Sequence, residues 1–91
     1  MEKKTEYMMT SGVASYVNTI DIPLLTKIAE RLHTDENYFI AFKPNGNQTT
    51  VTNGNNDTLT TLNTKVPDTM YFIRDDYDDR YVSILLFYYE Y

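Results

Sequence analysis

The segment from Met70 to Tyr91 constrains the fold of this chain more than any other part of the sequence. Two runs of apolar and aromatic residues, Met70 to Arg74 and Tyr81 to Tyr89, flank a short stretch dominated by aspartate. Runs rich in β-branched and aromatic residues on either side of a polar turn predict the two strands of a hairpin. Strands joined by so short a connection run antiparallel. The sequence therefore predicts an antiparallel sheet that contains both strands.

Up to three further strands are predicted earlier in the chain. Tyr38 to Phe42 is a compact apolar run, and the Lys43-Pro44-Asn45-Gly46 segment after it is a strong turn signal. Gln48 to Thr52 is short and β-branched, and Asn53-Gly54 then supplies a second hairpin turn. The run from Thr58 to Leu62 could return as a third strand. Short turns between consecutive strands predict a meander.

Two helices are predicted ahead of these strands. Ile22 to His33 has the apolar spacing of an amphipathic helix, and Asp21 can cap its start. An earlier stretch, about Thr5 to Val17, shows a weaker helical pattern that is interrupted by Gly12. We therefore expect an α+β fold in which two N-terminal helices pack on a four- to five-stranded antiparallel sheet. The 91 residues are enough for a single domain, 1–91.

The residue types that are missing argue against an enzyme. The chain has one histidine and no cysteine, so a Ser/His/Asp triad would have to use His33, which is expected at a helix end where it complements the dipole. The aspartates between the last two strands are expected at an exposed tip, whereas paired-carboxylate catalysis needs desolvated groups. They also lack the glycine and the trailing glutamate of an EF-hand loop. We expect no catalysis, no cofactor and no metal site.

The N-terminus is charged and no apolar run approaches the roughly 18 residues that a membrane span requires. Without cysteine or a signal-peptide pattern, the chain is expected to act in the cytoplasm and to have no membrane partner.

The negative charge is concentrated in the second half of the chain. Residues 52–91 carry seven acids and three bases, which leaves −4 of the total charge of −5. Such a surface repels phosphate backbones, so direct nucleic-acid binding is disfavoured. Residues of an extended chain rise about 3.3 Å each, close to the roughly 3.4 Å per nucleotide of a DNA strand. Carboxylates along a hairpin could thus imitate phosphates, or they could simply keep the protein soluble; the residues concerned are Asp75, Asp76, Asp78 and Asp79.

The last strand is apolar or aromatic on both faces. One face presents Val82, Ile84, Leu86 and Tyr88, and the other presents Tyr81, Leu85, Phe87, Tyr89 and Tyr91. A strand covered by helices on one face only should alternate apolar with polar residues. The pattern therefore indicates either a central strand buried on both sides or an exposed aromatic contact surface. Tyrosine favours the second interpretation because it is enriched at interfaces.

Three segments follow one another in a recognisable order. Ile22-Pro23-Leu24-Leu25 opens the second helix, Glu36-Asn37-Tyr38-Phe39-Ile40 forms the first strand, and residues 58–67 (TLTTLNTKVP) precede the penultimate strand. In this order, and as a small acidic domain, the chain resembles the phage-type uracil-DNA glycosylase inhibitors from about Val17 to Leu86.

The resemblance implies a protein that mimics DNA. Members of that family insert an edge strand bearing Glu-Ser-Ile into the DNA cleft of the enzyme, and an apolar groove beside the second helix receives the enzyme's intercalating side chain. The edge-strand position reads Asn18-Thr19-Ile20 in this sequence, without the glutamate. The groove corresponds to Leu25, Ile28, Leu32 and Ile40, which are also expected core residues.

Two functional hypotheses follow. The first is a non-enzymatic inhibitor, acting in a host bacterial cytoplasm if it is phage-encoded, that occupies the DNA-binding surface of a DNA-processing enzyme. The second is a small adaptor or homodimer that uses the aromatic C-terminal strand. The candidate contact residues are Asp75, Asp76, Asp78, Asp79, Tyr77, Asn18, Thr19, Ile20, Leu25, Ile28, Tyr89 and Tyr91.

Overall fold

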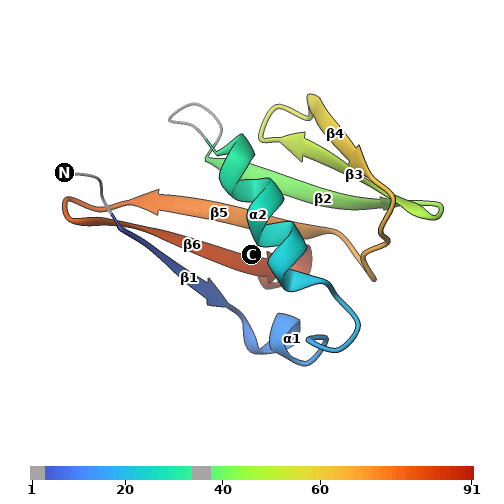
Figure 1. The fold of residues 1–91 in the computed structure, drawn as a ribbon, viewed down its shortest axis with the longest axis horizontal. Coiled ribbons are helices and arrows are strands. Elements are labelled where there is room, and N and C mark those ends of the chain that lie inside the picture. The colour runs from blue at the N-terminus through green and yellow to red at the C-terminus, as the bar shows by residue number, and fades with distance from the viewer. Residues whose placement is uncertain (1–3, 34–37) are drawn as a thin grey trace.

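The computed structural model describes residues 4–33 and 38–91. These residues form one six-stranded sheet with the order β1-β6-β5-β2-β3-β4, and a helix lies across one of its faces (Figure 1). The strands are β1 (Lys4–Met9), β2 (Phe39–Asn45), β3 (Gln48–Asn53), β4 (Thr58–Leu62), β5 (Met70–Asp76) and β6 (Arg80–Phe87). The helical segments are α1 (Ser11–Ala14), α2 (Ile22–Leu32) and the 3₁₀ turn η1 (Tyr88–Glu90).

The expected fold class is wrong at the N-terminus. The stretch predicted as a first helix, Thr5 to Val17, contains the strand β1 followed by the four-residue α1. β1 runs parallel to β6, from Lys4 opposite Arg80 to Met9 opposite Leu85. The sheet is therefore mixed and six-stranded, where an antiparallel sheet of four or five strands was expected. Hydrogen bonding to the edge of β6 overrides the weak helical periodicity of this segment.

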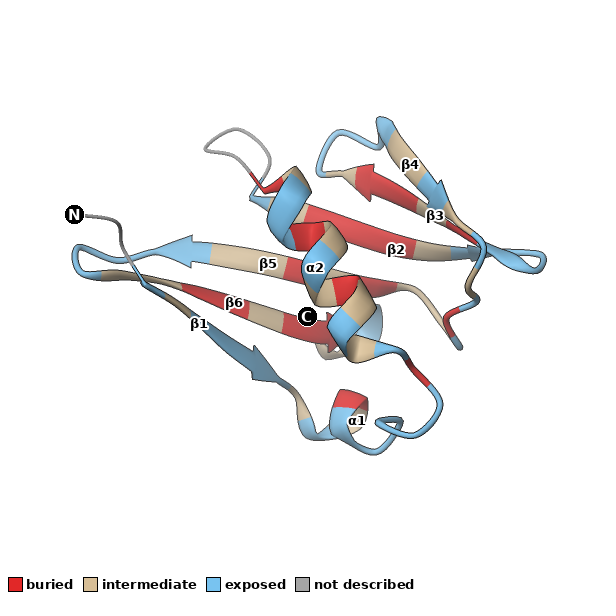
Figure 2. Cartoon of the chain, viewed as in Figure 1, coloured by how far each residue is buried: buried red, intermediate tan, exposed pale blue. Residues whose placement is uncertain are grey.

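α2 forms where the sequence predicts it. The Asp21 carboxylate accepts a hydrogen bond from the backbone N–H of Leu24 at 3.2 Å, and Pro23 occupies the first turn. Leu25 and Ala29 are buried against the sheet, so the apolar stripe faces the core. The buried positions alternate with exposed ones along the helix in Figure 2.

The core fills the space between α2 and the central strands. Pairing places Ile40, Phe72 and Leu85 in one row across β2, β5 and β6. The next row consists of Phe42, Met70 and Phe87. These side chains point to the α2 side of the sheet and pack with those of the helices in one cluster: Val13, Ile20, Leu25, Ala29, Ile40, Phe42, Val51, Val66, Met70, Phe72, Leu85 and Phe87.

A carboxylate fixes η1 to the start of α1. The Glu90 side chain accepts hydrogen bonds from the Thr10 hydroxyl at 2.6 Å and from the Phe87 backbone N–H at 3.0 Å. These two bonds, the Thr10 bond foremost, lower the pKa of Glu90. The carboxylate lies 2.7 Å from the position that a Cβ at residue 12 would occupy. Gly12 therefore permits this approach, which sets the position of Tyr91 after η1.

Candidate protein-binding surface

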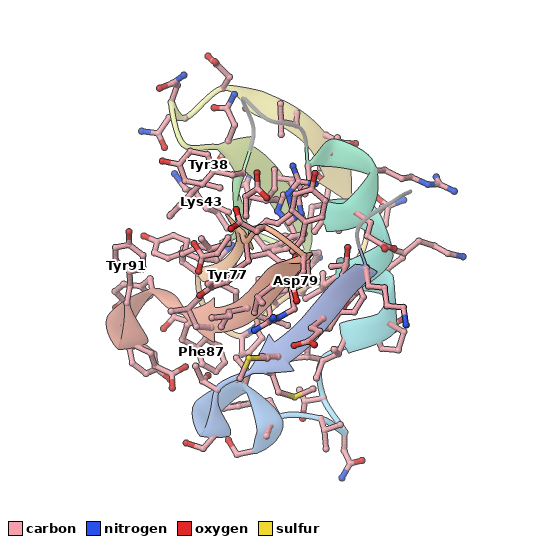
Figure 3. All side chains as sticks on the ribbon, turned by 90° about the vertical axis from the view of Figure 1, so that its left-hand side faces the viewer. Tyr38, Lys43, Tyr77, Asp79, Phe87 and Tyr91 are labelled. Carbon is pink, nitrogen blue, oxygen red and sulfur yellow. The ribbon has the colours of Figure 1, made fainter. Side chains whose placement is uncertain are left out.

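The two faces of the sheet have different coverings. α2 lies on one face, and among residues 4–33 and 38–91 only η1 and the residue after it lie on the other, which we call the open face (Figure 3). Tyr38, Lys43 and Tyr91 project on this side, away from α2. Side chains alternate along a strand, so pairing register identifies which other residues share the open face.

One row of the open face is apolar across four strands. Met8 of β1 pairs with Ile84 of β6, Ile84 pairs with Ile73 of β5, and Ile73 pairs with Phe39 of β2. Met8 is 57% exposed, and the other three are half-buried. A contiguous apolar row of this kind on a sheet face is typical of a surface that another molecule covers.

A second row adds aromatic rings at the C-terminal corner. Leu86 pairs with Tyr71, and Tyr71 pairs with Ala41. The ring of Tyr71 lies 4.7 Å from that of Phe39, centroid to centroid, and Tyr91 packs edge-on against both at 5.8 and 6.1 Å. Tyr91 itself is 78% exposed. The corner thus presents a tyrosine that is positioned by two rings beneath it and remains available for contact.

The hairpin end of the open face is acidic. Glu6, Val82 and Asp75 form the row next to the apolar one. The guanidinium of Arg80 lies 3.6 Å from the Glu6 carboxylate and 3.1 Å from that of Asp79, and it sits over the ring of Tyr77 at 5.3 Å. Figure 3 shows Tyr77 and Asp79 at this end of the molecule.

A hollow of about 310 Å³ opens on this face between the apolar rows and η1. Its lining combines an apolar floor with two carboxylates and a tyrosine: Ile73, Asp75, Ile84, Leu86, Glu90 and Tyr91. An aliphatic stem can lie on such a floor while a cationic head meets the carboxylates, which is how lysine and arginine side chains pack. An aromatic ring at the rim adds attraction for a cation.

The four aspartates of the β5–β6 hairpin do not form a single line of charge. Asp75 pairs with Val82 and Asp76 pairs with Tyr81, so these two neighbours point to opposite faces of the sheet. Asp78 is exposed in the turn, and Asp79 is engaged by Arg80. The cluster gives the hairpin tip a negative field, and one of its members, Asp75, adjoins the apolar row.

The segment expected to act as an edge strand lies elsewhere. Asn18 and Thr19 are exposed in the connection between α1 and α2, and Ile20 is buried in the core. In Figure 1 the β5–β6 hairpin lies at the left end of the molecule, and this connection lies apart from it, next to α1 and the start of α2. Along the described chain, the edge of the sheet beside β6 is β1 instead.

The expected apolar groove beside α2 is filled by the core. Leu25 and Ile40 are fully buried. Ile28 and Leu32 are half-buried and line a separate hollow of about 310 Å³ with Arg31 and two residues of β4. The groove residues are thus divided between the core and a shallow site near β4.

Tyr89 and Tyr91 have different surroundings although both are exposed. Tyr89 stacks on Phe87, a residue of the α2 side, with ring centroids 5.3 Å apart. Desolvation, and then the charge of Glu90, raise the pKa of Tyr89. Only Tyr91 of the pair packs on the open face.

The sequence analysis did not predict that Phe39, Tyr71 and Ile73 belong to the candidate surface. The available signal was the run of apolar residues at every position from Met70 to Ile73, which places apolar side chains on both faces of β5.

Comparisons with protein-family models, with curated proteins and with solved structures find no match for this chain. Within residues 4–33 and 38–91, no helix is long and apolar enough to cross a membrane. In the same part of the chain, no three His, Cys, Asp or Glu side chains gather as metal ligands would.

Proposed function

We propose that this protein is a non-enzymatic inhibitor that occupies the basic, nucleic-acid-binding surface of an enzyme in the cytoplasm. The open face is its contact surface. The observation that carries the proposal is the apolar row Met8–Ile84–Ile73–Phe39 with the acidic row of Glu6 and Asp75 directly beside it.

Charge complementarity selects the kind of partner. An apolar surface with an acidic end fits a protein surface that has apolar and cationic side chains next to one another, because complementary potentials steer association and suppress wrong partners. Surfaces that bind phosphate backbones are rich in lysine and arginine. The hollow beside Tyr91 has the chemistry to receive one such side chain.

The size of the molecule is adequate for this role. Its two longer principal extents are 41 and 28 Å, and a specific interface needs about 800 Å² from each partner. Face-to-face pairing of two copies would instead bring together two surfaces of a chain with a net charge of −5. Like charges in contact oppose such a homodimer.

An inhibition assay tests the proposal. The resemblance noted in the sequence makes bacterial uracil-DNA glycosylase the first enzyme to examine, followed by a panel of other bacterial DNA-processing enzymes. We expect stoichiometric inhibition of one of them, competitive with DNA and weakened by salt.

Paired variants identify the surface that is used. Asp75→Asn and Ile84→Ser should each weaken inhibition at least tenfold, whereas Asp57→Asn, the same charge change in the exposed β3–β4 turn, should not. Equal inhibition by all three variants would exclude the open face. A dimer in sedimentation equilibrium that dissociates on Tyr91→Ser would favour the homodimer over the inhibitor.

A further inference from the structure

A third hollow lies on the side of the sheet opposite to the open face, where α2 leaves part of β1, β6 and β5 uncovered (Figure 1). Its volume is about 370 Å³, within the lower part of the range of small-molecule sites. Residues from the second half of α2 form one wall, and residues from the three strands form the other. They are Thr5, Lys27, Glu30, Arg31, His33, Arg74, Tyr81 and Ser83.

The charge of this pocket is opposite to that of the whole protein. Three of the eight lysine and arginine residues line it, namely Lys27, Arg31 and Arg74; among residues 4–33 and 38–91, the one carboxylate in its lining is that of Glu30. The Tyr7 hydroxyl donates a hydrogen bond to the Glu30 carboxylate. A chain with a net charge of −5 therefore has a cationic cavity on one face.

A buried hydroxyl without a partner forms part of the wall. Ser83 is 1% exposed, and its Oγ makes no hydrogen bond within residues 4–33 and 38–91. In the sheet Ser83 pairs with Tyr7 on one side and with Arg74 on the other, so it lies in the middle of the cationic site. Buried polar atoms normally have partners, and one that lacks a partner calls for an explanation.

The neighbouring side chains are held in place by contacts of their own. The guanidinium of Arg74 lies over the ring of Tyr81, 4.3 Å from its centroid. His33 Nε2 donates a hydrogen bond to the Phe72 carbonyl at 3.3 Å. Burial lowers the pKa of His33, and the charge of Arg74 lowers it further, whereas the Phe72 bond and Glu30 oppose the change.

We propose that this pocket binds a small molecule that carries a phosphate group. Arg31, Arg74 and Lys27 neutralise the phosphate, and the Ser83 hydroxyl donates to one of its oxygens. The paired N–H donors of an arginine guanidinium match the geometry of phosphate oxygens, and the hydrogen bonds that they form are charge-assisted.

Charge and size favour phosphate monoesters among anions. A phosphate monoester carries a charge of about −1.5 to −2 at neutral pH, so it can interact with more than one of the cationic side chains that line the pocket. A polynucleotide would also supply phosphates, but its further charges would face a protein of net charge −5. The pocket therefore fits a free small molecule.

Titration of the ¹⁵N-labelled protein with inorganic phosphate, and then with glycerol 3-phosphate, at constant ionic strength tests the proposal. We expect saturable shifts centred on the backbone amides of Ser83 and Arg74. The imidazole pKa of His33 should also rise, because the bound anion offsets the charge of Arg74. Among residues 4–33 and 38–91, the charged side chains that line the same pocket as His33 are Arg74 from β5 and Glu30, Lys27 and Arg31 from α2.

Three variants separate a ligand site from a structural cluster. Arg31→Gln should weaken phosphate binding at least tenfold, while Lys43→Gln, the same charge change on the open face, should leave it unchanged. Ser83→Ala should weaken binding severalfold and yet raise the melting temperature of the ligand-free protein, since it removes a buried hydroxyl that lacks a partner.

Shifts that are linear in phosphate and spread over all lysine and arginine positions would overturn the proposal. Tighter, salt-dependent binding of a short single-stranded oligonucleotide, without saturation by either small anion, would overturn it in favour of a nucleic-acid backbone. The phosphate titration does not involve the open face. Its outcome therefore does not depend on whether the inhibition assay succeeds.

Discussion

The covered and open faces of the sheet carry side chains of the same apolar character along β5 and β6, yet they have different roles. Phe72 and Leu85 point to α2 and complete the core. Their neighbours Ile73 and Ile84 point the other way and stay half-buried. Apolar character alone therefore does not show which of these residues is enclosed; Phe72 and Leu85 lie on the side that the eleven-residue α2 covers, and Ile73 and Ile84 do not.

The largest effect is expected from truncating adjacent residues of β5. Phe72→Ala removes a fully enclosed ring and should cost about 3–5 kcal/mol of unfolding free energy. Ile73→Ala removes part of a half-buried side chain and should cost about 1 kcal/mol. Urea denaturation of both variants measures the two values. Equal losses would show that the open face is covered in solution, for instance by a second copy.

His33 makes the stability of the covered face depend on pH. Its pKa is lowered below 6.5, chiefly by burial, so the unfolded chain takes up the proton more readily than the folded one. The neutral His33 therefore makes its full contribution to the free energy of unfolding above pH 6.5. This contribution is lost as the pH falls below that value, towards and through the lowered pKa of the folded state. Urea denaturation between pH 7.5 and 5 should show this loss. In His33→Gln, the unfolding free energy should depend less steeply on pH. An unchanged dependence would mean that carboxylates alone cause it.

Tyr7 gives a smaller effect at the opposite end of the pH scale. Burial, together with the hydrogen bond to Glu30 and the charge of Glu30, raises its pKa to about 12. Because the unfolded chain loses this proton first, the contribution of Tyr7 to stability is complete below pH 10. It decreases as the pH rises towards 12. An absorbance titration should show Tyr7 ionising near pH 12; the pKa of Tyr89 is also raised, so Tyr7 is identified by the component that a substitution removes. The component near pH 12 should disappear in Tyr7→Phe and stay in Tyr89→Phe; its persistence in Tyr7→Phe would assign it to another tyrosine.

The smallest effect is expected at the corner of the open face. Gly12→Ala would place a methyl group against the Glu90 carboxylate, and the carboxylate can move only by giving up the Thr10 and Phe87 hydrogen bonds. We expect a small loss of stability and faster motion of residues 88–91 in ¹⁵N relaxation. Ala14→Gly, in the same short helix, is the control. Unchanged relaxation in Gly12→Ala would mean that Tyr91 is held by its ring contacts alone.

Local patterns in the sequence predicted the elements that local interactions determine. α2 has its cap and apolar stripe, and β2 to β6 are bounded by turn signals. β1 could not be predicted in this way, because its strand conformation depends on pairing with residues 80–85. A segment with a weak helical period and Gly12 near its middle gives no local sign of that partner.

The candidate surface was predictable only in part. The aspartates and Tyr91 stand out in composition, and the structure places Asp75 and Tyr91 around one hollow. Phe39 and Ile73 join them through strand pairing between distant segments. The cationic pocket was not foreseen, since its basic residues are scattered along an acidic chain and meet only after folding.

The parallel pairing of β1 with β6 has a consequence for how the chain folds. The residues that meet are 76 positions apart, from Lys4 with Arg80 to Met9 with Leu85, so the loop that must close contains nearly every other element. Closing so long a loop is entropically costly before the contacts can form, and non-local strand pairs slow folding. β1 should therefore join late, after the β5–β6 hairpin has formed, and until then the edge of β6 is open to strands of other molecules.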